Sequence, residues 1–116
     1  MGNKFAPLQK SEQGHSPDFN FYCLGCDCYH GVWTTSKNVS DAIWLFNNNL
    51  EKPTLSPSLL NRFVTYKQDQ NKNIIPTTIK NVVCHVFITD GMIQYLPDCT
   101  HYLAGQTIEL PNINDI

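Results

Sequence analysis

The chain has 116 residues, of which 41% are hydrophobic and 16% are charged, and its formal net charge is −2. This length suffices for one domain with a single hydrophobic core. The eight Lys and Arg residues are scattered and give no basic footprint, so we expect no nucleic-acid partner. No apolar run approaches the ~20 residues that span a bilayer, and the N-terminus lacks a signal-peptide pattern. We therefore expect no membrane partner and a cytoplasmic location.

The sequence also contains five cysteines. Five is an odd number, and without an export signal the chain is expected in a reducing compartment, where disulfides are rare. Metal binding is therefore the interpretation that we favour. The alternative is a set of free cysteines buried in the core, because unpaired cysteine is among the most buried residue types.

The first 18 residues are polar and show no periodicity, so we expect a flexible arm there. A single domain is predicted for residues 19–111, followed by a tail over residues 112–116. Within the domain, residues 19–23 and 30–35 alternate like two short strands. Between these strands, Cys23 and Cys26 are joined by a turn with a glycine, which directs both thiolates at one ion, as in a zinc knuckle.

The middle of the chain predicts at most one short helix and a stiff polar segment. Ser40 is a helix N-cap candidate before the apolar residues that end at 46. Two prolines hold residues 52–58 extended, which places Ser56 and Ser58 on one side. A strand is expected over residues 59–67.

The clearest local signal is a hairpin centred on Asp90-Gly91, a dipeptide that tolerates the positive φ angles of a type I′ turn. It predicts strands over residues 79–89 and 92–96, and an edge strand follows over residues 106–111. Alternation then puts Cys84 and His85 on opposite faces.

Residues beyond this hairpin complete both predicted sites. If the second strand stays extended past Pro97, Cys99 joins the face of Cys84, and Asp98 joins the face of His85. Four ligands close a structural zinc site, so the predicted set is Cys23, Cys26, Cys84 and Cys99. A competing set replaces one cysteine with His101 or His85. The expected fold is a mostly β, small antiparallel domain with a zinc knuckle and at most one short helix.

On the other face, His85 and Asp98 form a pair in which the carboxylate can orient the imidazole. A serine within hydrogen-bonding reach would complete a set of nucleophile, base and orienting acid. His101 is the alternative base.

Five segments of the sequence together indicate a family. They are FYCxGC at residues 21–26, WxFN at 44–47, PTLSPSLL at 53–60, CHxFIxDG at 84–91 and DCTHxLAGQT at 98–107. This combination resembles a family of small phage and bacterial proteins long described as of unknown function. One branch of that family belongs to bacterial ubiquitin-like conjugation (Bub) operons, where it acts as a serine-type, deubiquitinase-like peptidase.

The resemblance implies a β domain supported by structural Zn²⁺ and a protein substrate that is ubiquitin-like. Its implied catalytic residues are Ser56 or Ser58 as the nucleophile, His85 or His101 as the base, and Asp98 as the orienting acid. Two alternatives stay open. One is a zinc-dependent hydrolase with an open metal site, and the other is a non-catalytic zinc-binding phage module that binds a host protein.

Overall fold

The computed structural model describes residues 2–9 and 16–116. Within these residues the chain is mostly β and contains two 3₁₀ turns but no α-helix, and none of its helices is long and apolar enough to cross a membrane. The elements, in chain order, are β1 (Ala6–Pro7), β2 (Phe19–Cys23), β3 (Cys28–Val32), β4 (Leu45–Phe46), β5 (Leu55–Ser56), β6 (Leu59–Thr65), η1 (Pro76–Thr78), β7 (Lys80–Thr89), β8 (Met92–Tyr95), β9 (Thr107–Glu109) and η2 (Ile113–Asp115).

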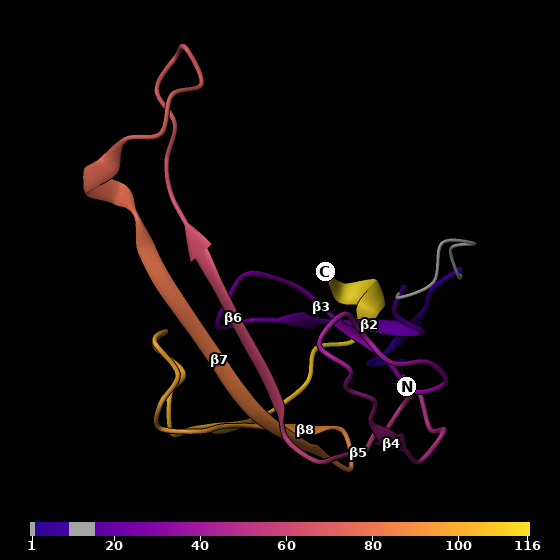
Figure 1. Cartoon of the computed structure of the whole chain (residues 1–116). Helices are drawn as coiled ribbons and strands as arrows, with labels where there is room; N and C mark the ends of the chain where they lie inside the picture. Colours follow the sequence, from indigo (N-terminus) through magenta and orange to yellow (C-terminus); the bar gives the residue numbers. More distant parts are fainter. Residues whose placement is uncertain (1, 10–15) are drawn as a thin grey trace.

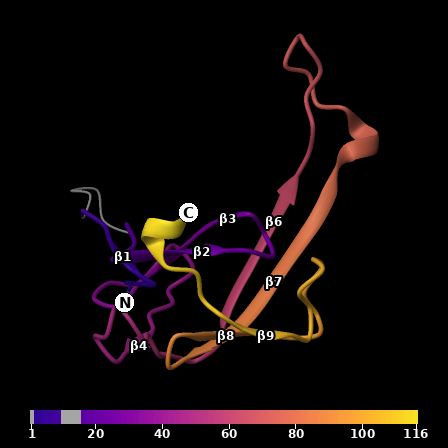
Figure 2. The same ribbon diagram turned by 180° about the vertical axis from the view of Figure 1, so that it is seen from behind.

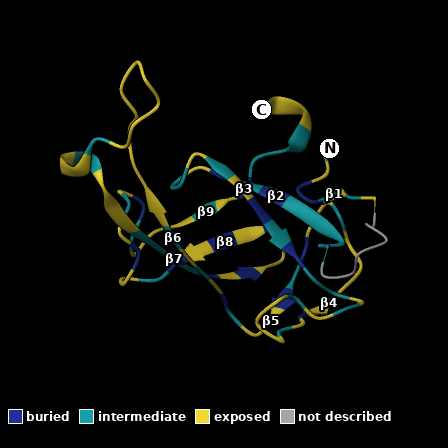
Figure 3. Ribbon diagram, turned by 45° about the horizontal axis from the view of Figure 1, so that its top comes forward, coloured by how far each residue is buried: buried dark blue, intermediate teal, exposed yellow. Residues whose placement is uncertain are grey.

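The strands form three antiparallel sheets, with the orders β1-β2-β3, β4-β5 and β6-β7-β8-β9. Strands β6 and β7 are the longest, and together with the loop between them they project from the body as an arm (Figure 1). Seen from behind, the two chain termini lie on the side of the molecule away from this arm (Figure 2). The outer part of the arm is largely exposed, whereas burial is concentrated in the body (Figure 3).

Alternation along β7 separates a buried face from an accessible one. Cys84, Val86 and Ile88 are buried, while His85 and Phe87 between them are not. Successive side chains in a strand point to opposite faces, so one face of this sheet packs inward. The core draws residues from all three sheets: Phe5, Phe21, Cys23, Val32, Trp44, Leu55, Leu59, Cys84, Val86, Ile88, Ile93, Tyr95, Cys99, Leu103 and Leu110.

The hairpin around Asp90-Gly91 has the predicted register. Thr89 is opposite Met92, and the two turn residues have φ angles of 52° and 79°, as a type I′ turn requires. The second strand does not stay extended past Pro97, because β8 ends at Tyr95 and the chain turns, with the Cys99 N–H donating to the Leu96 carbonyl oxygen at 3.1 Å. Proline has no N–H to contribute to a ladder, which explains the end of the strand.

Both ends of the chain pack more closely than the sequence predicted. Within the described part of the expected arm, Ala6–Pro7 pairs with β2 and the Phe5 side chain is fully buried. The Ile113 N–H donates to the Asn3 carbonyl oxygen at 2.8 Å, so the tail is attached to the N-terminal segment. Residues 10–15 of the expected arm lie outside the described residues.

The short helix allowed for residues 40–46 does not form. Asp41 has a positive φ of 66°, and Leu45–Phe46 pairs with β5 instead. An isolated helix of two turns is marginal, and the sheet contact offers a competing set of backbone hydrogen bonds.

We expect Phe5→Ala to lower the free energy of unfolding by about 3–5 kcal/mol, because truncating a fully buried phenylalanine leaves a cavity. The ring stacks on Phe21 with centroids 5.6 Å apart and also contacts Phe46. Urea denaturation measures the change. Val39→Ala is the control, because Val39 is 83% exposed and its truncation should change stability by less than about 0.5 kcal/mol. Equal effects of the two substitutions would contradict the packing of the N-terminal segment.

Candidate functional site

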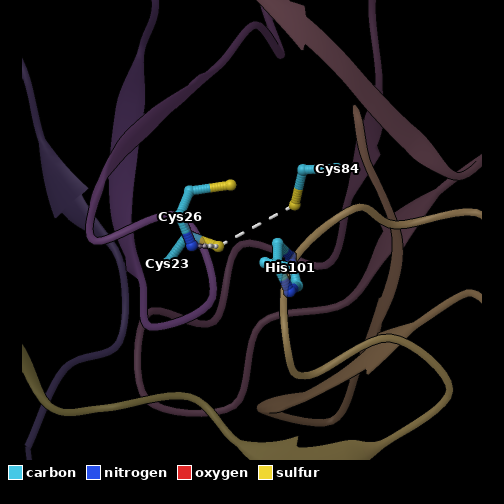
Figure 4. Close-up of side chains that lie close together, drawn as sticks. All are labelled: Cys23, Cys26, Cys84 and His101. Carbon is cyan, nitrogen blue, oxygen red and sulfur yellow. Dashed lines mark hydrogen bonds between the residues drawn. The ribbon is translucent and has the colours of Figure 1, made fainter. Parts of the chain in front are cut away.

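Three cysteines and one histidine meet inside the body of the protein. Cys23 is the last residue of β2, and Cys26 lies in the turn between β2 and β3. Cys84 comes from β7, and His101 from the turn after β8. Their ligand atoms all lie within 4.8 Å of one another, and the four side chains converge (Figure 4). The Sγ atoms of Cys23 and Cys84 are 3.8 Å apart, which matches the about 3.8 Å edge of a tetrahedron with Zn–S bonds of about 2.3 Å.

A glycine in the knuckle lets the histidine approach. A Cβ atom built on Gly25 would lie 2.2 Å from Cε1 of the His101 ring, so any larger residue would displace the ring. The Nε2 atom of His101 is buried and has no hydrogen-bond partner within the described part of the chain. A buried, unpaired ring nitrogen beside three thiols fits a metal ligand, since such a group is costly when it is left without a partner.

Mutual contact and burial shift the pKa values of the three thiols in different directions. A hydrogen bond with Cys84 lowers the pKa of Cys23 to about 3, with smaller contributions from His30 and Tyr95. Burial and the charge of Cys23 raise the pKa of Cys26 to about 12. The pKa of Cys84 is also raised, because its thiol is hydrogen-bonded to Cys23. A divalent cation supplies the positive charge that allows such a set of thiols to ionise together.

The cluster differs in one member from the predicted set of four cysteines. Cys99 is buried but lies outside the cluster, where its Sγ accepts the His85 N–H and donates to the His85 carbonyl oxygen, both at 3.3 Å. His101 takes the fourth place, as in the competing set. The turn after Tyr95 explains the exchange, because it directs Cys99 toward the β7 backbone and brings His101 to the thiols. Cys28 is also outside the cluster.

A second constellation lies on the accessible face of the sheet. The Ser58 Oγ is 3.0 Å from Nε2 of His85, and Nδ1 of the same ring is 3.1 Å from Oδ2 of Asp98. When Nδ1–H donates to the carboxylate, Nε2 is free to accept the serine proton. The side chains of His85 and Asp98 are 26% and 55% exposed, so a substrate can reach them.

Three elements position this constellation. Ser58 directly precedes β6, where Leu60 pairs with His85 of β7, and Asp98 comes from the turn after β8. The indole Nε1–H of Trp44 donates to the Ser58 carbonyl oxygen at 3.2 Å and fixes the backbone of the serine. Nothing in the sequence indicated this contact of Trp44, because aromatic residues in so small a domain are more often part of the core.

The structure separates the remaining candidates from this constellation. Ser56 is exposed on β5 and pairs with Leu45, and in the described residues it forms no hydrogen bond with His85 or His101. His101, the alternative base, belongs to the metal cluster. Tyr95, whose hydroxyl is 3.3 Å from the Sγ of Cys23, is a further contact of that cluster that the sequence did not reveal.

A hydroxyl, an imidazole and a carboxylate joined in series by hydrogen bonds are the site geometry of the serine hydrolases. A family model described as "Bacterial ubiquitination-like system serine protease (BubE)" matches residues 5–96, a range that includes Ser58 and His85. The chain belongs to this family of serine proteases, which implies a protein as its substrate. Searches of curated proteins and of solved structures found no further match.

We expect the intact cluster to take up one Zn²⁺ and Cys84→Ser to abolish this binding, because the substitution removes one of four donors. Metal-to-protein stoichiometry after zinc loading and desalting measures this. Cys99→Ser is the matched control and should retain the ion, since Cys99 is outside the cluster. The four-cysteine set would be supported instead if Cys99→Ser lost the ion and His101→Ala kept it.

Metal affinity is also expected to fall as the pH falls. Binding requires the thiols of Cys26 and Cys84, whose pKa values are raised, to lose their protons, whereas the pKa of Cys23 is lowered to about 3 by its hydrogen bond with Cys84. Release of two protons weakens the affinity about 100-fold for each pH unit of acidification. Competition against a chelator of known affinity between pH 6 and pH 8 measures the slope, and a flat profile would contradict thiolate ligation.

Proposed function

We propose that this chain is an active serine protease that cleaves the peptide bond following the C-terminal tail of a ubiquitin-like protein. In this proposal Ser58 is the nucleophile, His85 the general base and Asp98 the residue that orients the base. The observation that carries the assignment is the unbroken series of two hydrogen bonds, of 3.0 Å and 3.1 Å, from Ser58 through His85 to Asp98. Membership of a serine protease family supports the reaction class.

The geometry suits acyl transfer. Nε2 of His85 takes the Ser58 proton while Oγ attacks the carbonyl carbon of the scissile bond, and the same proton then passes to the leaving amine as the C–N bond breaks. Water hydrolyses the resulting ester by the reverse sequence of proton transfers. Asp98 stabilises the imidazolium that forms in each half of the reaction.

Zinc has a structural role in this proposal, held by Cys23, Cys26, Cys84 and His101. The donor set supports this role, because three sulfurs and one imidazole fill a tetrahedral site and leave no position for a water. For the same reason the alternative of a zinc-dependent hydrolase, which needs an open coordination position, is less well supported. The hydrogen-bonded series of Ser58 and His85 likewise disfavours the alternative of a non-catalytic module that only binds a host protein.

The ubiquitin-like substrate rests on the family alone, whose description places the protease in a ubiquitination-like system. Deconjugation and maturation in such a system both require cleavage after a C-terminal tail. The side chains of His85 and Asp98 are 26% and 55% exposed, so an extended tail can reach the adjacent Ser58.

We expect Ser58→Ala to lower the turnover number about 10⁴-fold or more, because it removes the nucleophile of a cooperating set. Cleavage of a fusion between the ubiquitin-like protein and a reporter, followed by mass spectrometry of the products, measures the loss. Covalent labelling by a fluorophosphonate probe should disappear in the same variant.

Ser56→Ala is the matched control, because this serine lies two residues away and outside the hydrogen-bonded series. It should keep both activity and labelling, and both variants should keep the metal content and melting temperature of the unsubstituted chain. Full activity of Ser58→Ala, or loss of activity in Ser56→Ala alone, would overturn the assignment of the nucleophile.

A further inference from the structure

The strand that begins next to the nucleophile has a free edge. Strand β6 stands at one end of the order β6-β7-β8-β9, so among the described strands it is hydrogen-bonded only to β7. A strand with one neighbour leaves every second residue with its N–H and C=O directed outward.

The hydrogen bonds of β7 identify the residues of β6 whose backbone groups point outward. His85 directs both backbone groups away from β6, since its N–H donates to Cys99 Sγ and its carbonyl oxygen accepts from the Leu96 N–H at 2.9 Å. Leu60, which lies opposite His85, therefore belongs to a non-hydrogen-bonded pair and points its own groups outward. Val83, opposite Arg62, is likewise bonded to Thr100 on its far side.

The outward groups are consequently those of Leu60, Arg62 and Val64. Alternation puts the side chains of these three residues on the same face as His85. The side chains are accessible as well, since Leu60 is 44% and Val64 51% exposed and Arg62 is also exposed. Backbone groups for pairing and side chains for selectivity thus lie along one edge that starts two residues after Ser58.

Strand direction decides which part of a substrate fits. Strand β6 runs away from Ser58, so a peptide that pairs antiparallel with it runs toward Ser58. Its C-terminal end then arrives at the nucleophile, and the residues that precede the scissile bond occupy the edge. The seven residues of β6 span roughly 23 Å, which is enough for about six residues of an extended tail.

We infer that β6 binds its protein substrate by strand addition: the extended tail before the scissile bond pairs antiparallel with the backbone of Leu60, Arg62 and Val64. This inference rests on the proposed function for the identity of the bond at Ser58. Peptides that complete a sheet edge gain affinity from main-chain hydrogen bonds and selectivity from alternate side chains. Natural proteins usually cover or disrupt exposed sheet edges, because such edges promote self-association. An open edge beside a nucleophile is therefore expected to bind a partner strand.

Val64→Pro tests the inference. It removes one outward N–H and places a ring against an added strand, while the ladder to β7 does not use that N–H. Val64→Thr is the matched control, because it keeps the N–H and nearly the same shape. Both substitutions are introduced into the Ser58→Ala chain, and ten-residue random peptides displayed on phage are selected against the chain with Val64 intact. We expect the selected peptides to bind the proline variant at least about tenfold more weakly and the threonine variant almost unchanged.

Hydrogen exchange of the Ser58→Ala chain gives the second readout. A bound peptide should slow exchange of the Leu60, Arg62 and Val64 amides, whereas those of Asn61 and Phe63 are already protected by β7. Failure to select any peptide, equal binding by both Val64 variants, or a dimer that Val64→Pro dissociates would overturn the inference. Peptide binding does not need the hydroxyl of Ser58. If the probe did not label the unsubstituted chain, that result would contradict the proposed function but not strand addition at β6.

Discussion

Cys84 and His85 are neighbours in the sequence, and the alternation of β7 sends their side chains to opposite faces of one strand. On the inner face, Cys84 meets the knuckle and the ring of His101. On the outer face, His85 links Ser58 to Asp98. A single strand therefore carries one member of each site, and any shift of its register by one residue would exchange the two faces and destroy both.

The cluster of three cysteines and one histidine is also the point where separate parts of the fold are joined. It brings the β2–β3 hairpin, which belongs to a different sheet, against β7 and the turn after β8, which are also joined to each other by backbone hydrogen bonds. A domain of this size has a limited core, and a bound metal adds its binding free energy to folding. Cys84 places β7, the strand that also carries His85, at this junction.

The turn between Tyr95 and Gly105 contains three residues that contact three different groups. Asp98 reaches the ring of His85, Cys99 exchanges hydrogen bonds with the His85 backbone, and His101 faces the thiols. Cys99 therefore contributes by holding the backbone that carries His85. Strand β7 lies between β6 and β8. The imidazole of His85 is therefore oriented from the β8 side, whereas the free edge of β6 lies on the opposite side of β7.

Local chemistry in the sequence determined much of this structure. The Asp90-Gly91 turn set the register of β7 and β8, and the alternation around it separated Cys84 from His85. The spacing of Cys23 and Cys26 predicted a cluster of metal-ligating side chains. These features depend on residues close together in the chain, where turn conformation and period leave few choices. Only tertiary structure brought Ser58 rather than Ser56 to the ring of His85, and His101 rather than Cys99 to the three thiols. The two members of each pair are only two residues apart, and either one has the chemistry for the role, as a hydroxyl nucleophile or as a zinc ligand. The outcome therefore depends on how the chain leaves β5 and β8 and on contacts with strands far away in the sequence.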